Sequence, residues 1–271
     1  MHARPLMLVV AAVACALTAA PATAAPSWAP ASSAAIHPGV QTLTAGGQCT
    51  ANFVFYDAAN VYLGQAAHCS GTGAATETDG CDSGSLPLGT AVDIGGSKPG
   101  TLAYNSWLTM QTHGEANADT CAYNDLALVK VDPADVGKVN PSIPFWGGPT
   151  GLDGDGTATG DTVLSYGNSS LRGGITLLSP KQGKSLGDDG GGWSHTVYTV
   201  TPGIPGDSGS AFLGADGKAL GVLSTVALAP LAGSNGVGDL ARELAYLNST
   251  GGFSVTLATG TEPFRGPLLP I

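Results

Sequence analysis

Short apolar runs that alternate with turn residues are the feature that most constrains the fold of this chain. Such runs, rich in valine, leucine and aromatic residues, lie at 49–56, 61–66, 91–94, 101–110, 126–131, 162–166, 175–178, 194–201, 210–213 and 220–227. Glycine, proline and aspartate separate them at fairly regular spacing, a pattern typical of β-sandwiches and barrels and not of alternating β and α units. We therefore predict an all-β protein.

One segment near the C-terminus instead has the spacing of a helix. Asp239 can cap its start, Leu240, Leu244 and Leu247 share one face, and Gly251 can end it. The sequence therefore predicts a single clear helix, placed after the last of the long strands.

Residues 1–24 have the pattern of a secretory signal peptide, because Arg4 precedes an apolar run that ends in small residues. A lipid anchor on Cys15 is the alternative, although Ala12 stands where such signals usually carry leucine. No later stretch reaches the roughly 20 apolar residues that a membrane-spanning helix needs. We expect a secreted, extracellular protein with no membrane partner.

The remainder of the chain divides by composition. Alanine, proline, serine and glycine dominate the segment that follows the signal, and a proline- and glycine-rich stretch separates two strand-rich halves. We therefore expect an extended leader at 25–47, a first β domain at 48–133, a linker at 134–156, a second β domain with the helix at 157–250, and a tail at 251–271.

Charge and cysteine content narrow the class of partner. The formal net charge of −10 repels nucleic acid phosphates, so no nucleic acid partner is expected. Beyond the signal, four cysteines remain, and an even number in an exported chain predicts two disulfides. A zinc site is the alternative, but these cysteines form no Cys-x-x-Cys pair, and we expect no metal.

Three local motifs carry the chemistry: QAAHC at 65–69, NDLALV at 124–129 and PGDSGS at 205–210. They supply a histidine, an aspartate and a serine in that chain order, which differs from the orders in subtilisins and α/β-hydrolases. Over about residues 49–250 the chain resembles the chymotrypsin-like serine proteases, especially those exported by actinobacteria. This resemblance implies two packed antiparallel six-stranded barrels with a C-terminal helix, and an active site between them.

The residue types suit nucleophilic catalysis. A serine hydroxyl attacks efficiently only when a base removes its proton, and an imidazole with a pKa near 6.5 can do so at neutral pH. We therefore assign Ser208 as nucleophile and His68 as general base. Asp125 would hold the other imidazole nitrogen and stabilise the imidazolium that forms.

The resemblance also implies an oxyanion hole made by the backbone N–H groups of Gly206 and Ser208, where one lost donor costs about 2.7–4 kcal/mol of transition-state stabilisation. Ser224 matches a serine that hydrogen-bonds the buried aspartate in the family, although an ordinary strand serine is an equal alternative. Asp207 needs a charge partner if it is buried, and Arg172 is the candidate; a surface arginine is the alternative.

The specificity pocket is expected along Pro202, Ser224, Thr225 and Val226. The resemblance places Pro202 where trypsin-like members carry an aspartate, so no fixed charge selects arginine or lysine. Leu223 replaces the histidine of glutamate-specific members. We therefore expect the pocket to accept small or medium apolar side chains of the substrate, with a broad preference among them.

We predict the disulfides Cys49–Cys69 and Cys81–Cys121. The expected function is that of a monomeric serine endopeptidase that acts on polypeptide substrates without a cofactor. A catalytically silent relative that serves as an extracellular binding module is the alternative, and a triad that mainly cleaves esters is a second.

Overall fold

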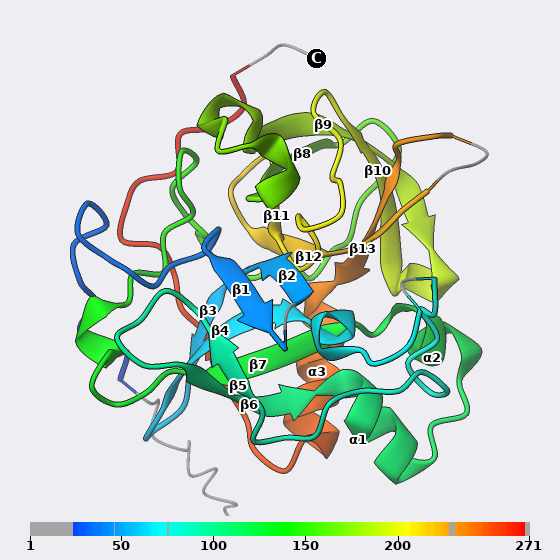
Figure 1. Ribbon diagram of the computed structural model, residues 1–271. Helices are drawn as coiled ribbons and strands as arrows, with labels where there is room; N and C mark the ends of the chain where they lie inside the picture. The colour runs from blue at the N-terminus through cyan, green and yellow to red at the C-terminus, as the bar shows by residue number, and fades with distance from the viewer. Residues whose placement is uncertain (1–23, 46, 75, 228–230, 269–271) are drawn as a thin grey trace, which may run out of the picture.

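The structure is a computed structural model that describes residues 24–45, 47–74, 76–227 and 231–268. Two β-sheet units make up the fold. All strands of the first unit except the last, residues 256–257, are coloured blue to green in Figure 1, and those of the second unit are coloured green to orange. The predicted signal peptide, including Cys15, lies almost entirely outside the described residues. Within the described part of the chain, no helix is long and apolar enough to cross a membrane.

The first unit is an antiparallel sheet of eight strands in the spatial order β14-β3-β4-β7-β6-β5-β1-β2. Its central strands are buried, apart from Lys130 at the end of β7, because they pack between two layers of apolar side chains. The strands are β1 (Gln41–Thr44), β2 (Gly47–Thr50), β3 (Val54–Tyr56), β4 (Val61–Ala66), β5 (Ala91–Asp93), β6 (Gly100–Asn105), β7 (Leu126–Lys130) and β14 (Thr256–Leu257).

The second unit is a closed barrel of six strands in the order β10-β13-β12-β11-β8-β9. Its interior holds a cluster of six buried apolar side chains, which includes Phe212 and Val237. The strands are β8 (Thr162–Tyr166), β9 (Pro180–Asp189), β10 (Ser194–Thr199), β11 (Ala211–Gly214), β12 (Ala219–Val226) and β13 (Asn235–Asp239). The all-β prediction and the six-stranded form of this barrel, which the resemblance implied, are confirmed.

The first unit differs from the expected six strands because two more strands join it. β1 comes from the segment expected to be an extended leader, and β14 comes from the expected tail. Apolar side chains explain how the leader is held: Ile36 is fully buried and forms a parallel bridge with Val139, and Trp28 packs against the same core. The segment is therefore an integral part of the first unit from well before residue 48.

The run at 101–110 is half strand and half helix. β6 ends at Asn105, whose side-chain oxygen accepts hydrogen bonds from the N–H groups of Trp107 and Leu108 at 2.9 and 3.3 Å. That cap starts α1 (Ser106–His113), and a short α2 (Ala118–Tyr123) follows it. Neither helix was predicted: the apolar residues of 101–110 match a strand equally well, and residues 118–123 show no apolar run.

The second barrel also differs from the prediction, and its strand β13 was not predicted either. The run at 175–178 is a 3-10 turn, Thr176–Leu178, and not a strand. β9 was not predicted, because its residues, PKQGKSLGDD, have neither apolar alternation nor high β propensity.

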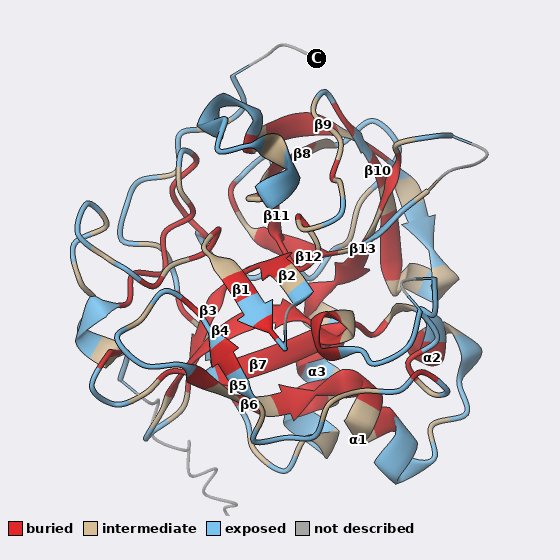
Figure 2. Cartoon of the chain, in the orientation of Figure 1, coloured by how far each residue is buried: buried red, intermediate tan, exposed pale blue. Residues whose placement is uncertain are grey.

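The predicted helix is α3 (Leu240–Thr250), which begins after the cap Asp239. Its three leucines are buried and join a core that includes side chains from both units, such as Phe53 and Val222. Figure 2 shows this buried region running through the middle of the molecule, with exposed residues on the peripheral loops. The helix therefore helps to fix one unit against the other.

Residues 256–268, which we call the C-terminal strap, run across both units. β14 pairs with β3 of the first sheet, and further on the N–H of Arg265 donates to the carbonyl of Trp146 at 2.9 Å. At the far end the N–H of Leu268 donates to Oε1 of Gln182 in β9 at 2.8 Å. Figure 1 shows this segment, in red, along one side of the molecule.

Candidate active site

The two units bring two of the three motif residues, His68 and Ser208, to one cavity, and the third, Asp125, lies buried beside His68. His68 lies in a 3-10 turn, Ala67–Ser70, directly after β4, and Asp125 lies immediately before β7. Both are held by the first sheet, because β4 and β7 are paired neighbours. Ser208 comes from the loop between β10 and β11 of the barrel. His68 and Ser208 both line a cavity of about 830 Å³ between the units.

Asp125 contacts His68 at two points, one on the imidazole and one on the backbone. Its Oδ2 lies 2.7 Å from Nδ1 of His68, and its Oδ1 accepts a hydrogen bond from the backbone N–H of His68 at 2.9 Å. Burial disfavours the imidazolium, but the charge and hydrogen bond of Asp125 outweigh burial and raise the pKa of His68 above 6.5. The geometry leaves Nε2 as the nitrogen that can exchange a proton with another group.

Two further side chains complete the surroundings of Asp125. The hydroxyl of Ser224, on β12, donates to Oδ2 of Asp125 at 2.6 Å, the contact that the resemblance implied. On the other side, the N–H of Asp125 donates to Oε1 of the fully buried Glu243 at 3.0 Å. Burial, with the nearby charges of Asp125 and Asp239, raises the pKa of Glu243 well above its usual range.

The loop around Ser208 presents two unused donors. None of the hydrogen bonds among the described residues uses the backbone N–H of Gly206 or of Ser208, and both residues line the cavity. Gly206 has φ +92°, a conformation that favours glycine. The hydroxyl of Ser208 and Nε2 of His68 likewise make no hydrogen bond in the described contacts; such bonds often tighten only when substrate is bound.

Asp207, next to Ser208, is fully buried and is paired with two cations. Its Oδ2 lies 2.5 Å from Nη2 of Arg172 and 3.0 Å from Nζ of Lys181. Burial alone would raise the pKa of Asp207, but these partners lower it. Arg172 is thus the partner expected from the sequence, whereas Lys181, itself fully buried, was missed because lysine in a polar strand normally indicates exposure.

One end of the cavity lies between residues 203–206 and 223–226. Asn235, on β13, joins these two walls: its Oδ1 accepts from the N–H of Gly203 at 2.8 Å, and its Nδ2 donates to the carbonyl of Thr225 at 3.2 Å. The side chain is almost completely buried. A single buried amide group therefore joins the two walls.

Of the residues expected to form the specificity pocket, three line the cavity and one does not. Ser224, Thr225 and Val226 line the cavity, as does Leu223. Pro202 is not among the lining residues; its carbonyl instead accepts from Nη2 of Arg172 at 2.9 Å. Asn235 was missed because its glycine-rich segment, NGVGD, did not indicate a strand.

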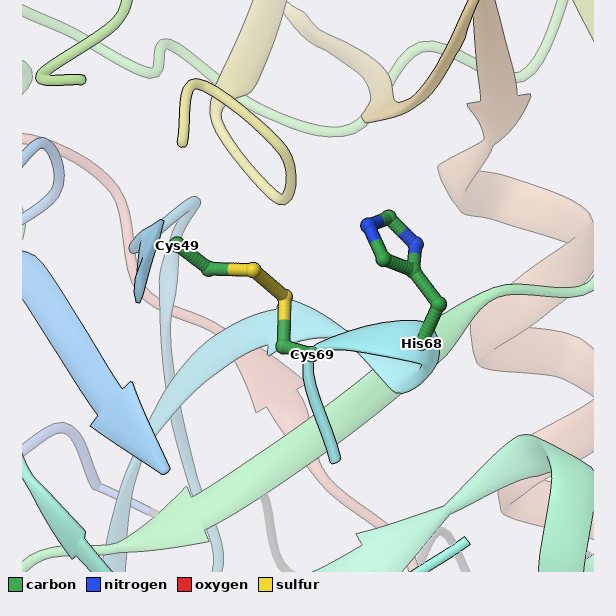
Figure 3. A group of neighbouring side chains, drawn as sticks. All are labelled: Cys49, His68 and Cys69. Carbon is green, nitrogen blue, oxygen red and sulfur yellow. A yellow bond between two sulfur atoms is a disulfide. The ribbon is translucent and has the colours of Figure 1, made fainter. Parts of the chain in front are cut away.

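The disulfides join Cys49 to Cys69 and Cys81 to Cys121, the pairs expected from the sequence. Figure 3 shows the imidazole of His68 beside the first of them. The three side chains Cys49, His68 and Cys69 are close enough to hold a metal ion, with their ligand atoms within 4.8 Å of one another. Both sulfurs are used in the disulfide, however, so the group has no thiolate to offer a metal.

Comparison with solved structures identifies the fold. Protease A of Thermobifida fusca superposes with a TM-score of 0.55 at 18% sequence identity, covering 84% of this chain and 100% of that one. A Cellulomonas bogoriensis chymotrypsin gives a TM-score of 0.51 at 16% identity, covering 82% of this chain and 98% of the other.

The chain has the chymotrypsin-like fold. A protease of Nocardiopsis also matches, with a TM-score of 0.50 at 19% identity over 82% of this chain and 98% of its own. No family model and no curated protein sequence matches the chain. In this chymotrypsin-like fold the cavity lies between the two units, where residues of both can act on one bound molecule.

Proposed function

We propose that the protein is a secreted serine endopeptidase in which Ser208, His68 and Asp125 hydrolyse peptide bonds through an acyl-enzyme. The observation that carries the proposal is the arrangement of the cavity. An imidazole fixed by a buried carboxylate shares it with a serine and with two unused backbone donors on the serine loop. These are the parts that acyl transfer to a serine requires.

In the acylation step the Ser208 oxygen attacks the carbonyl carbon of the scissile bond while Nε2 of His68 takes the hydroxyl proton. The carbonyl oxygen becomes an oxyanion that accepts from the N–H groups of Gly206 and Ser208. Asp125 stabilises the imidazolium through the hydrogen bond that it accepts from Nδ1. His68 then gives its proton to the leaving amine as the carbon–nitrogen bond breaks.

In the deacylation step water replaces the amine. His68 removes a proton from the water as its oxygen attacks the acyl carbon, and the second oxyanion uses the same two donors. The proton returns to Ser208 Oγ when the ester bond breaks, which restores the starting state. No cofactor takes part in either step.

We further propose a preference for small apolar side chains immediately before the scissile bond. The amide of Asn235 spans the two walls of the cavity end and leaves little depth for a large side chain. Glu77 is the only acidic residue among the described residues that line the cavity, and it is not part of these walls. Nothing at this end therefore favours arginine or lysine.

The same proposal includes secretion of the protein into an oxidising environment. Two disulfides join four cysteines of the described chain, and such bonds persist mainly outside the cytosol. The signal-like segment at 1–24 supports the same location.

Labelling with a fluorophosphonate tests the proposal against a catalytically silent binding module. We expect one label per molecule, on Ser208, and hydrolysis of peptide amides by the wild-type protein but not by Ser208→Ala. Folded wild-type protein that neither takes the label nor cleaves peptides would favour the binding module. Turnover of esters without matched amides would favour the esterase alternative.

A further inference from the structure

The loop that carries the two unused N–H donors is held from outside by Ser169. This residue is buried, with 3% of its surface exposed, and precedes the 3-10 turn Ser170–Arg172. Its hydroxyl donates to the carbonyl of Pro205 at 2.6 Å, and its backbone N–H donates to Oδ1 of Asp207 at 2.9 Å. Ser169 is not among the residues that line the cavity, so its contacts with the loop are made outside the cavity.

The direction of the Ser169 hydroxyl is determined by its neighbours. The N–H of Leu171 donates to the same oxygen at 3.2 Å, so the oxygen is already an acceptor. Its own proton is therefore available for the carbonyl of Pro205. The Ser169 side chain acts as a fixed donor to this one peptide group.

Because a peptide group is planar, the contact between Ser169 and the Pro205 carbonyl also fixes the direction of the Gly206 N–H. In a trans peptide the N–H and the C=O point in opposite directions, and the Pro205–Gly206 bond is not among the cis bonds of the described chain. Because the carbonyl of Pro205 points to Ser169, behind the loop, the N–H of Gly206 points to the cavity side. A rotation of this peptide would exchange the two and put a carbonyl oxygen where the oxyanion has to bind.

The backbone of the loop does not itself prevent that rotation. Gly206 has no Cβ and can adopt either sign of φ at little cost. The next carbonyl, that of Gly206, is fixed separately by Nε2 of Gln48 and Oγ1 of Thr50, both at 2.8 Å. The Pro205 carbonyl, in contrast, has Ser169 as its partner among the described hydrogen bonds.

We propose that Ser169 is a positioning residue that keeps the oxyanion hole formed, by holding the Pro205–Gly206 peptide with its N–H toward the cavity. The inference rests on the proposed function, since it assigns a role in the same reaction. Ser169 acts through the peptide and does not touch the reacting atoms.

The decisive experiment compares variants at Ser169 with the neighbouring serine as a matched control. Ser169→Ala removes the hydroxyl, whereas Ser169→Thr and Ser169→Val have the same shape and differ in the hydroxyl. Ser170→Ala is the control, because Ser170 is exposed and its hydroxyl makes no described hydrogen bond. The measurements are kcat and KM for a peptide amide, with active sites counted by complete fluorophosphonate labelling.

We expect Ser169→Ala and Ser169→Val to lower kcat about 10- to 100-fold, approaching the roughly 10²–10³-fold cost of one lost oxyanion donor, with KM changed less than threefold. Ser169→Thr should stay within about threefold of the wild type, and Ser170→Ala should be unchanged. If Ser169→Ala fails to fold, the threonine and valine variants give the comparison. Equal kcat for these two would overturn the proposal.

A peptidyl trifluoromethyl ketone separates positioning from general disruption. It forms a hemiketal whose oxyanion needs the hole, whereas the corresponding carbinol fills the same subsites without one. The inhibition constant of the ketone should rise in parallel with the loss of kcat, and that of the carbinol should not change. A parallel loss for both compounds would contradict the proposal. An inactive wild-type protein would refute the proposed function itself, whereas an active wild type with an equally active Ser169→Val would refute only the role of Ser169.

Discussion

Removing the guanidinium from Asp207 tests how the serine loop is held. Asp207 is fully buried, and Arg172 and Lys181 both reach its Oδ2. We consider Arg172→Met, which keeps much of the aliphatic bulk and removes the charge. The Asp207 carboxylate then keeps a single cation, Lys181, at 3.0 Å.

The expected magnitude follows from what remains around Asp207. Breaking a buried ion pair costs about 3–5 kcal/mol when the other charge is left without a partner. Lys181 stays in place, as do the N–H groups of Ser169 and Ile204 that donate to the carboxylate. We therefore expect the lower end, about 3 kcal/mol, which is roughly a 10²-fold change in the folding equilibrium. The double variant Arg172→Met/Lys181→Met should lose more than the two single variants together.

Urea unfolding with a common m value measures these differences. Lys218→Met is the control, because Lys218 pairs with Asp216 on the surface, where both side chains are largely exposed; it should change stability little. Peptidase activity should fall with Arg172→Met, since Asp207 adjoins Ser208. An Arg172→Met protein with the stability and activity of the wild type would show that the ion pair does not hold the loop.

Four further outcomes are expected. Asp125→Asn should lower kcat about 10⁴-fold, because the imidazole loses the acceptor that selects its tautomer; near-normal turnover would mean that another group orients it. The acidic limb of kcat/KM against pH should have an apparent pKa above 6.5, since Asp125 raises the pKa of His68 and only the neutral imidazole accepts a proton; a limb below 6.5 would contradict this assignment. Replacing Cys49 and Cys69 by alanine should cost about 3 kcal/mol for a loop with a sequence separation of 20, measured by thermal or urea unfolding. Asn235→Gly should raise kcat/KM for a phenylalanine substrate relative to its alanine counterpart at least 10-fold, and an unchanged ratio would show that Asn235 does not limit the pocket.

The sequence was informative where the proposed chemistry is carried by local motifs. His68, Asp125 and Ser208 lie in short segments whose composition and chain order are distinctive, and strands with apolar runs, such as β4 and β7, were found close to their observed bounds. The hydrophobic pattern is itself the physical cause of burial in those strands, which is why it predicts them.

The residues that were missed depend on partners far away in the chain. Lys181 and Glu243 are fully buried ionisable groups, and a sequence gives no sign of burial for such side chains unless the partner is known. Asn235 acquires its role only when β13 lies beside β12. Ser169 is an ordinary serine in a loop until the loop meets Pro205.

The C-terminal strap has a consequence for how the molecule unfolds. The chain completes the second barrel, returns through α3, pairs with the first sheet at β14 and then reaches β9 of the barrel at Leu268. Loss of the first sheet therefore detaches the strap from β3 and removes the α3 packing that both units share. We therefore expect that neither unit melts as an independent domain, and that the molecule gives one cooperative calorimetric transition whose van't Hoff and calorimetric enthalpies agree.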